Sequence, residues 1–221
     1  MSNAIRRLGA LALVGTVATC LAFASTASAA NSVTYSNSAG DPAAPDVSSV
    51  TVSNDDHGVL TFAISVPSRP TAGPNEVLSV FIDPGMNPSD GAGPNFEGAS
   101  LVLDVEQGSV DLGKWNGSTF DFSGGSPPTL VYSWANGVVT IKVNAADLQL
   151  TSFDFWVASI ADGTVDVPSI DTAPQPGHGS YRYDVKISPL TLPVITKSNG
   201  SKGLPKCLKH HKSTKAHHCH K

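Results

Sequence analysis

Residues Leu60 to Val66 read LTFAISV, and this stretch decides the fold class. Large apolar side chains occupy every second position, with small or polar side chains between them. Because successive side chains of a β-strand point to opposite faces, this alternation predicts a strand that buries one face. The same period of two recurs near residues 50–53, 78–82, 101–105, 139–143, 153–157 and 181–187. Such short, regularly broken strands predict an all-β fold, an antiparallel β-sandwich of the jelly-roll or immunoglobulin-like kind.

The segments between these strands carry turn signals. Asn116-Gly117 and Asn136-Gly137 are dipeptides typical of tight hairpins, since both residue types accept the positive φ of a primed turn. One helical turn is predicted at residues 144–148, with Asn144 as its cap. The chain has no alternation of strands with long helices, which argues against a parallel α/β fold.

Residues 1–30 have the organisation of a signal peptide. Arg6 and Arg7 precede an apolar run at 8–24, and small residues at 26–30 predict a cut after residue 29 or 30. A transmembrane anchor is the alternative, but the run is short and ends in the cleavage signature. A lipoprotein signal at Cys20 is a weaker match, because Thr precedes the cysteine. The sequence therefore predicts a secreted, extracellular protein with no membrane span.

Charge divides the exported chain into two parts. Residues 31–190, the predicted β-sandwich domain, hold 18 acidic and 5 basic residues, a net charge of 5 − 18 = −13. Residues 191–221 hold 7 lysines and no acidic residue, a net charge of +7, and lack any apolar period. The second part is therefore predicted to be a linker and a basic tail that is not part of the core. Its charge would suit anionic cell-wall polymers and so association with the cell surface. A nucleic-acid partner is not expected, because the tail has neither arginine nor aromatic residues.

The tail also holds Cys207 and Cys219, the two cysteines outside the signal segment. In an exported protein two such cysteines commonly form a disulfide. Histidines crowd the same segment and, with the thiolates, form a set that suits zinc or copper. These histidines are His210, His211, His217, His218 and His220. A disulfide, a metal site and neither of them stay open as alternatives.

The segment 76–98, EVLSVFIDPGMNPSDGAGPNFEG, joins a predicted strand to an acidic loop rich in glycine. Oxygen-bearing side chains at short spacing suit a hard cation, and Asp83, Asn87 and Asp90 are the candidate calcium ligands. The loop is not an EF-hand, because no glutamate stands at the twelfth position. A metal-free turn between two strands is the other interpretation.

Three short motifs give a resemblance over residues 38–188. They are the opening from Gly40-Asp41-Pro42 to Pro67, the block VFIDPGMNPSDGAG at 80–93, and the late aromatic strand GSYRY at 179–183. With these motifs the chain resembles the extracellular β-sandwich modules related to family 9 carbohydrate-binding modules and DOMON domains. The resemblance implies an extracellular sandwich that binds a glycan. Gly85 stands where the family has a second aspartate, so one calcium ligand implied by the resemblance is missing.

Exposed aromatic side chains are a further clue to a ligand, because a sugar ring stacks its apolar C–H face on them. Trp156 is out of phase with the apolar positions of its strand, so it should point away from the core and share a face with Asp154. Trp115 stands beside a predicted hairpin tip, and Trp134 is in phase with buried positions. Trp156, Asp154 and Trp115 are therefore the candidate ligand contacts. Edge covering and core filling are the alternative roles for all three tryptophans.

No catalytic motif is present. The chain lacks a nucleophile elbow, a P-loop, a zinc-binding HExxH and a CxxC. Asp104 and Glu106 share one strand face, but exposed acidic faces are common in proteins that hydrolyse nothing. The sequence thus predicts a non-enzymatic binding module for a carbohydrate or cell-envelope polymer. An anchored structural protein and a metal-binding tail are the alternatives.

Overall fold

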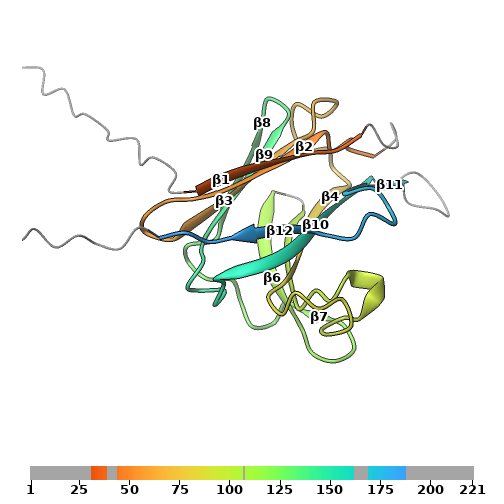
Figure 1. Ribbon diagram of the computed structural model, residues 1–221. Coiled ribbons are helices and arrows are strands. Elements are labelled where there is room, and N and C mark those ends of the chain that lie inside the picture. The colour runs from red at the N-terminus through yellow and green to blue at the C-terminus, as the bar shows by residue number, and fades with distance from the viewer. Residues whose placement is uncertain (1–30, 39–43, 107, 162–168, 188–221) are drawn as a thin grey trace, which may run out of the picture. The chain divides into compact units, whose positions relative to one another are not determined.

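A computed structural model describes residues 31–38, 44–106, 108–161 and 169–187, and every structural statement here concerns these residues. They form two antiparallel sheets, and the prediction of an all-β sandwich is confirmed (Figure 1). The first sheet has the order β1 (Asn31–Ser36), β2 (Ser49–Asn54), β3 (Val59–Ser65), β9 (Val138–Asn144), β8 (Val131–Ala135). The second has the order β11 (Ser169–Ala173), β10 (Ser152–Ala161), β4 (Glu76–Asp83), β5 (Leu101–Glu106), β6 (Ser109–Trp115), β7 (Phe120–Asp121), and β12 (Tyr181–Asp184) also pairs with β10.

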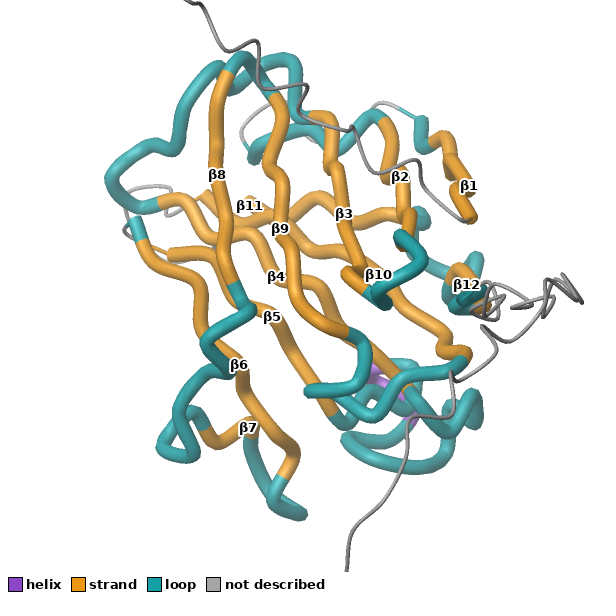
Figure 2. The backbone as a smooth tube through the Cα atoms, turned by 90° about the vertical axis from the view of Figure 1, so that its left-hand side faces the viewer, coloured by secondary structure: helices purple, strands orange, loops and turns teal. Residues whose placement is uncertain are grey.

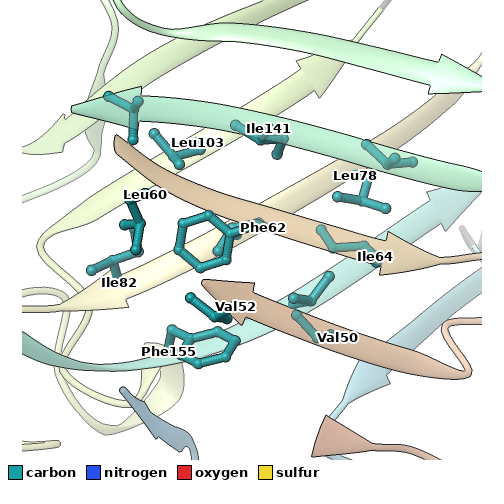
Figure 3. Close-up of a cluster of buried hydrophobic side chains, with 14 of the residues drawn as sticks. Val50, Val52, Leu60, Phe62, Ile64, Leu78, Ile82, Leu103, Ile141 and Phe155 are labelled. Carbon is teal, nitrogen blue, oxygen red and sulfur yellow. The ribbon is translucent and has the colours of Figure 1, made fainter. Parts of the chain in front are cut away.

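The core lies between the two sheets, which Figure 2 shows one behind the other. In each strand with alternating apolar and polar residues, the apolar side chains point into the core. In β3, Leu60, Phe62 and Ile64 are fully buried for this reason. Phe62 meets Phe155 of the opposite sheet with ring centroids 5.6 Å apart, and Figure 3 shows this contact among aliphatic neighbours. Apolar burial of this kind contributes roughly 25 cal/mol per Å², which makes the layer between the sheets the main source of stability.

The structure has the tight hairpin turn predicted at Asn136-Gly137 but lacks the helical turn predicted at residues 144–148. Asn136 and Gly137, with φ of 54° and 74°, connect β8 and β9 as a two-residue primed turn requires. Residues 145–149, by contrast, form turns and not the predicted helix. Asn144 still acts as a cap, because its Oδ1 accepts a hydrogen bond from the Ala146 amide at 2.9 Å. Gln149 has a left-handed φ of 57°, which stops a helix after one turn.

The long strand β10 changes partner along one edge. Its residues 152–155 pair with β12, and its residues 157–161 pair with β11. Trp156 lies between these two partners, while its other edge pairs with Phe81 of β4. The connection from β11 to β12 therefore leaves the sheet beside Trp156.

The described domain begins at Asn31, so β1 starts directly after the predicted cut at residue 30. The Asn31 side chain donates a hydrogen bond to the Asp184 carbonyl oxygen at 2.8 Å, near the end of the described chain. The predicted signal segment at 1–30 and the tail at 191–221, with Cys207, Cys219 and the five histidines, lie outside the described residues. Within the described ranges, no helix has the length and apolar character needed to cross a membrane.

Candidate functional site

An aromatic cluster covers the outer face of the second sheet, on the side away from the core. The rings of Trp156 and Phe81 are stacked, with centroids 4.1 Å apart and planes 9° apart. Phe96 and Phe120 pack around Phe81, each with its ring centroid 5.6 to 5.7 Å from that of Phe81. The Trp156 indole N–H donates to the Phe96 carbonyl oxygen at 3.1 Å, which fixes the ring in its plane.

A cavity of about 260 Å³ opens beside Trp156, where β10 changes partner. We call it the Trp156 cavity, and its lining includes Asn95, Glu97, Trp156, Thr172, Pro174 and Gln175. The cavity borders the Trp156 side chain, whose ring also stacks on Phe81, close to the place where β10 changes its partner from β12 to β11. The fold thus places an aromatic ring, the prolines Pro174 and Pro176 and several polar side chains around the Trp156 cavity.

The acidic loop after β4 supplies one wall of this cavity. It holds the 3₁₀ helix η1 (Pro94–Phe96), which Figure 1 shows near β7. Since Phe96 packs onto Phe81 and accepts the indole hydrogen bond, its neighbours Asn95 and Glu97 are carried to the cavity. The loop needs glycine at Gly98, whose φ is 78° and where a Cβ would lie 2.2 Å from the Asn87 carbonyl oxygen. The sequence motif and the aromatic side chain therefore belong to one site.

Asp83 organises the start of the loop. It is 4% exposed, and its carboxylate accepts hydrogen bonds from the amides of Gly85 at 2.8 Å and Asn87 at 2.6 Å. Burial raises the pKa of the Asp83 carboxyl, although these amide hydrogen bonds act in the opposite direction. The Asn87 side-chain oxygen in turn accepts from the Ser89 amide at 3.2 Å. The loop is thus closed by its own backbone amides.

Calcium at Asp83, Asn87 and Asp90 stays a prediction. Within the described part of the chain, no group of three or more His, Cys, Asp or Glu side chains is arranged to hold a metal ion. The Asp83 carboxylate has lone pairs beyond the two amide hydrogen bonds, and loop carbonyls are further oxygen ligands that a cation accepts.

Asp154 shares the outer face with Trp156, as the strand phase predicts, but it does not line the cavity. Its two carboxylate oxygens bind the Arg182 guanidinium of β12 at 2.7 and 3.0 Å. Asp83 lies directly opposite Asp154 on β4, so Arg182 lies beside two carboxylates that would otherwise repel each other. Asp154 therefore forms an ion pair with Arg182 between two neighbouring strands of the sheet.

Two polar groups of the Trp156 cavity lack partners within the described residues. The Thr172 hydroxyl oxygen is buried without a hydrogen bond, and the Glu97 carboxylate has no hydrogen bond or ion pair there. The Gln175 side-chain amide donates to the Ser38 carbonyl oxygen at 3.3 Å and to Asp171 at 3.4 Å. A buried hydroxyl without a partner costs free energy.

The other tryptophans are not in this cavity. Trp115 packs edge-on against Phe120, with centroids 5.4 Å apart, at the far end of the aromatic cluster. Trp134 packs against the core and donates its indole N–H to the Arg69 carbonyl oxygen at 3.0 Å, in agreement with its predicted inward phase. Glu97, Thr172 and Gln175 are lining residues that the sequence did not single out. The late motif near Gly179 was the nearest signal, because it follows the loop that forms the cavity wall.

A second cavity of about 260 Å³ lies on the same sheet and is lined by Asp104, Glu106, Ser109, Asp111 and Phe122. Asp104 and Asp111 are directly opposite each other on β5 and β6. Burial, followed by a smaller effect of Glu106 and Asp111, raises the pKa of the Asp104 carboxyl, against the hydrogen bond from Ser79. Like charges held this close destabilise the sheet, and this acidic group defines no ligand by itself.

The fold and the site define a protein class: an antiparallel β-sandwich with an aromatic-walled cavity on the outer face of one sheet. No protein-family model, curated protein or solved structure matches the chain. The similarity to family 9 carbohydrate-binding modules and DOMON domains therefore stays a prediction from short motifs.

Proposed function

We propose that this protein is a secreted, non-enzymatic binding module that holds a carbohydrate in the Trp156 cavity. The observation that carries the proposal is the indole ring, which stacks on Phe81 and borders an open cavity. A sugar ring has an apolar face of C–H groups and a rim of hydroxyls, so it needs one flat aromatic wall and several polar groups at the edge.

The polar lining matches that rim. Asn95 and Gln175 provide amides, and Glu97 provides a carboxylate. The volume of about 260 Å³ lies below the roughly 300–1,000 Å³ of pockets for drug-sized ligands. A single sugar residue, at a chain end or as a branch, is therefore the ligand of suitable size.

The lining also supports binding without hydrolysis. Glycosidases need a pair of carboxyl groups at a set separation, about 5 to 10 Å apart. Among the described residues that line the Trp156 cavity, Glu97 is the one carboxylate. The cavity therefore offers recognition chemistry, and it lacks the second acid of a hydrolase.

The test is a polysaccharide pull-down followed by calorimetry with the protein produced from the full chain. Trp156→Ala should abolish binding of the polymer that the wild type retains. Trp115→Ala is the matched control, because Trp115 belongs to the same aromatic cluster but does not line the cavity. Wild-type protein that retains no polysaccharide, or equal binding by Trp156→Ala, would refute the proposal.

A second candidate function is attachment to the cell surface through the basic tail. The net charge of +7 over residues 191–221, against −13 over residues 31–190, favours it. We expect deletion of residues 197–221 to release the protein from cells into the medium. Calorimetry of the full chain with zinc and copper, before and after reduction of Cys207 and Cys219, separates metal capture by the tail from a disulfide.

A further inference from the structure

We infer that the Trp156 cavity selects a sugar with a free, protonated amine over its N-acetylated or acidic counterpart. This inference rests on the proposed function and names the ligand class for the same cavity. The central residue is Glu97, which the loop after β4 carries to the cavity in a left-handed conformation with φ of 52°. Its side chain is half-buried, and within the described residues no group pairs with its carboxylate.

The charged residues around the cavity also favour a cationic ligand. Of the five basic residues between 31 and 190, none lines the Trp156 cavity, and Arg182 is held by Asp154. The neighbouring Asp171 accepts a hydrogen bond from the Val47 amide at 2.8 Å, and Asp154 and Asp83 lie on the same side of the sheet. A ligand carboxylate would therefore enter a negative field, while an ammonium group would be attracted to it.

The hydrogen-bonding groups also favour a donor. The Gln175 amide nitrogen donates to the Ser38 carbonyl oxygen and to the Asp171 carboxylate, and no described group donates to the Gln175 side-chain carbonyl oxygen. The Glu97 carboxylate and the Gln175 carbonyl oxygen are thus two acceptors, beside the Asn95 amide, for the N–H and O–H groups of a ligand. An ammonium on a carboxylate makes a charge-assisted hydrogen bond, which is about twice as strong as a neutral one. An N-acetyl group removes that charge and adds bulk at the same position.

His178 is the nearest group that would oppose this preference. It lies in the loop between β11 and β12, is exposed, and lines an adjoining hollow with Tyr181 and Asn37. It does not line the Trp156 cavity. The comparison is best made at a pH at which the sugar amine is protonated.

The experiment compares three trisaccharides by calorimetry: one of glucosamine, one of N-acetylglucosamine and one of galacturonic acid. Glucosamine should bind about fivefold more tightly than N-acetylglucosamine at low salt, the size of one partly exposed charge pair, and high salt should reduce the difference. Glu97→Gln keeps the shape and should remove the preference while N-acetylglucosamine affinity changes less than about twofold. Glu106→Gln is the matched control, because Glu106 lies on the same sheet but lines the other cavity.

The outcomes separate the two claims. An unchanged preference in Glu97→Gln, or an equal loss in Glu106→Gln, would overturn the amine selectivity, since the attraction would then be general. Tighter binding of the N-acetylated or acidic trisaccharide by the wild type would overturn it as well. Trp156→Ala tests the proposed function separately, because loss of the aromatic wall should weaken all sugars that bind.

Discussion

The indole ring of Trp156 lies parallel to the phenyl ring of Phe81, with 4.1 Å between the ring centroids and 9° between the planes. The two residues are directly opposite each other on β10 and β4, so the register of the sheet itself aligns the rings. On the other edge of β10, the switch from β12 to β11 leaves Trp156 without a strand beside it. The indole therefore stacks on Phe81 and borders the Trp156 cavity.

Phe81→Ala removes this support. We expect the free energy of unfolding to fall by about 2–3 kcal/mol, because a half-buried ring and its aromatic contacts are lost. Sugar binding should weaken as well, since Trp156 gains freedom to tilt. Urea unfolding and calorimetry measure the two effects. Phe122→Ala is the control: Phe122 follows β7 directly and is 42% exposed, and its loss should cost less than about 1 kcal/mol.

Thr172→Val separates binding from folding. The Thr172 hydroxyl is buried without a partner in the described structure, so an isosteric methyl group should leave stability unchanged or raise it by about 1 kcal/mol. The affinity for a bound sugar should change less than about twofold, because the hydroxyl oxygen is closed to the cavity. Thr172→Ser restores the hydroxyl and should return the stability to that of the wild type. A loss of stability in Thr172→Val would show that the hydroxyl has a structural partner.

The acidic loop offers a matched pair of glycines for a stability test. Gly98 and Gly93 have φ of 78° and 75°, but only at Gly98 would an added Cβ meet other atoms, the nearest at 2.2 Å. Gly93→Ala should cost about 1–3 kcal/mol for the backbone conformation alone, because φ of 75° with ψ of −172° is a region essentially restricted to glycine. Gly98→Ala should cost at least about 3 kcal/mol, since the loop must also move. Thermal unfolding of both variants measures the difference, and equal effects would contradict the close packing.

Asp104 should make the protein more stable in mild acid than at neutral pH. Burial raises the pKa of its carboxyl above 3.8, so the fold favours the protonated form. The resulting stability is complete below the ordinary value and is lost as the pH rises through the raised pKa. Asp104→Asn should therefore be more stable than the wild type at pH 7, and the difference should shrink toward pH 4.

The measurement is urea unfolding at several pH values. Asp121→Asn is the contrasting control, because hydrogen bonds from Ser123 lower the pKa of the Asp121 carboxyl. Its removal should reduce stability at pH 7, with the opposite sign of pH dependence. Asp104→Asn that is less stable than the wild type at neutral pH would contradict the burial argument.

The calcium prediction for Asp83, Asn87 and Asp90 is tested by thermal unfolding. Calcium that binds the folded loop should raise the Tm as its concentration rises. At a hundredfold excess over Kd it should add about 2.7 kcal/mol to the free energy of unfolding. A chelator should reverse the effect, and Asp90→Asn should reduce it. Asp90→Asn is preferred to a change at Asp83, because the Asp83 carboxylate also holds two loop amides. A Tm that changes with neither calcium nor chelator would contradict the calcium prediction and indicate a metal-free turn.

Alternation in the sequence was sufficient to predict the core strands. Leu60, Phe62 and Ile64 face inward because their spacing matches the pleat, and Asn136-Gly137 forms the hairpin that its positive φ angles allow. Strand β1 was missed, because it carries mostly exposed polar residues and its position depends on pairing with β2. The predicted helix at 144–148 was wrong, since local propensity was overridden by the return of the chain at Leu150 toward Ala145.

The site was predicted only in part. The strand phase placed Trp156 on the outer face, and the acidic loop was identified as a distinct feature. Their meeting in one cavity depends on Phe96 packing onto Phe81, a contact between segments that no local pattern reveals. Thr172 and Gln175 were missed for the same reason: they border the cavity because β10 changes partner, and that switch is a property of the folded sheet.

The hydrogen bond from Asn31 to the Asp184 carbonyl oxygen has an architectural consequence, and it is reinforced by a second link from Asn54 to Lys186. Within the described residues, strand β1 and the segment after β12 therefore lie side by side. In a domain of this kind, the two ends of the described chain lie close together. Such a domain can be spliced into a surface loop of a host protein, or opened at a hairpin tip such as Asn116-Gly117 and rejoined at its original ends, without a change in the core.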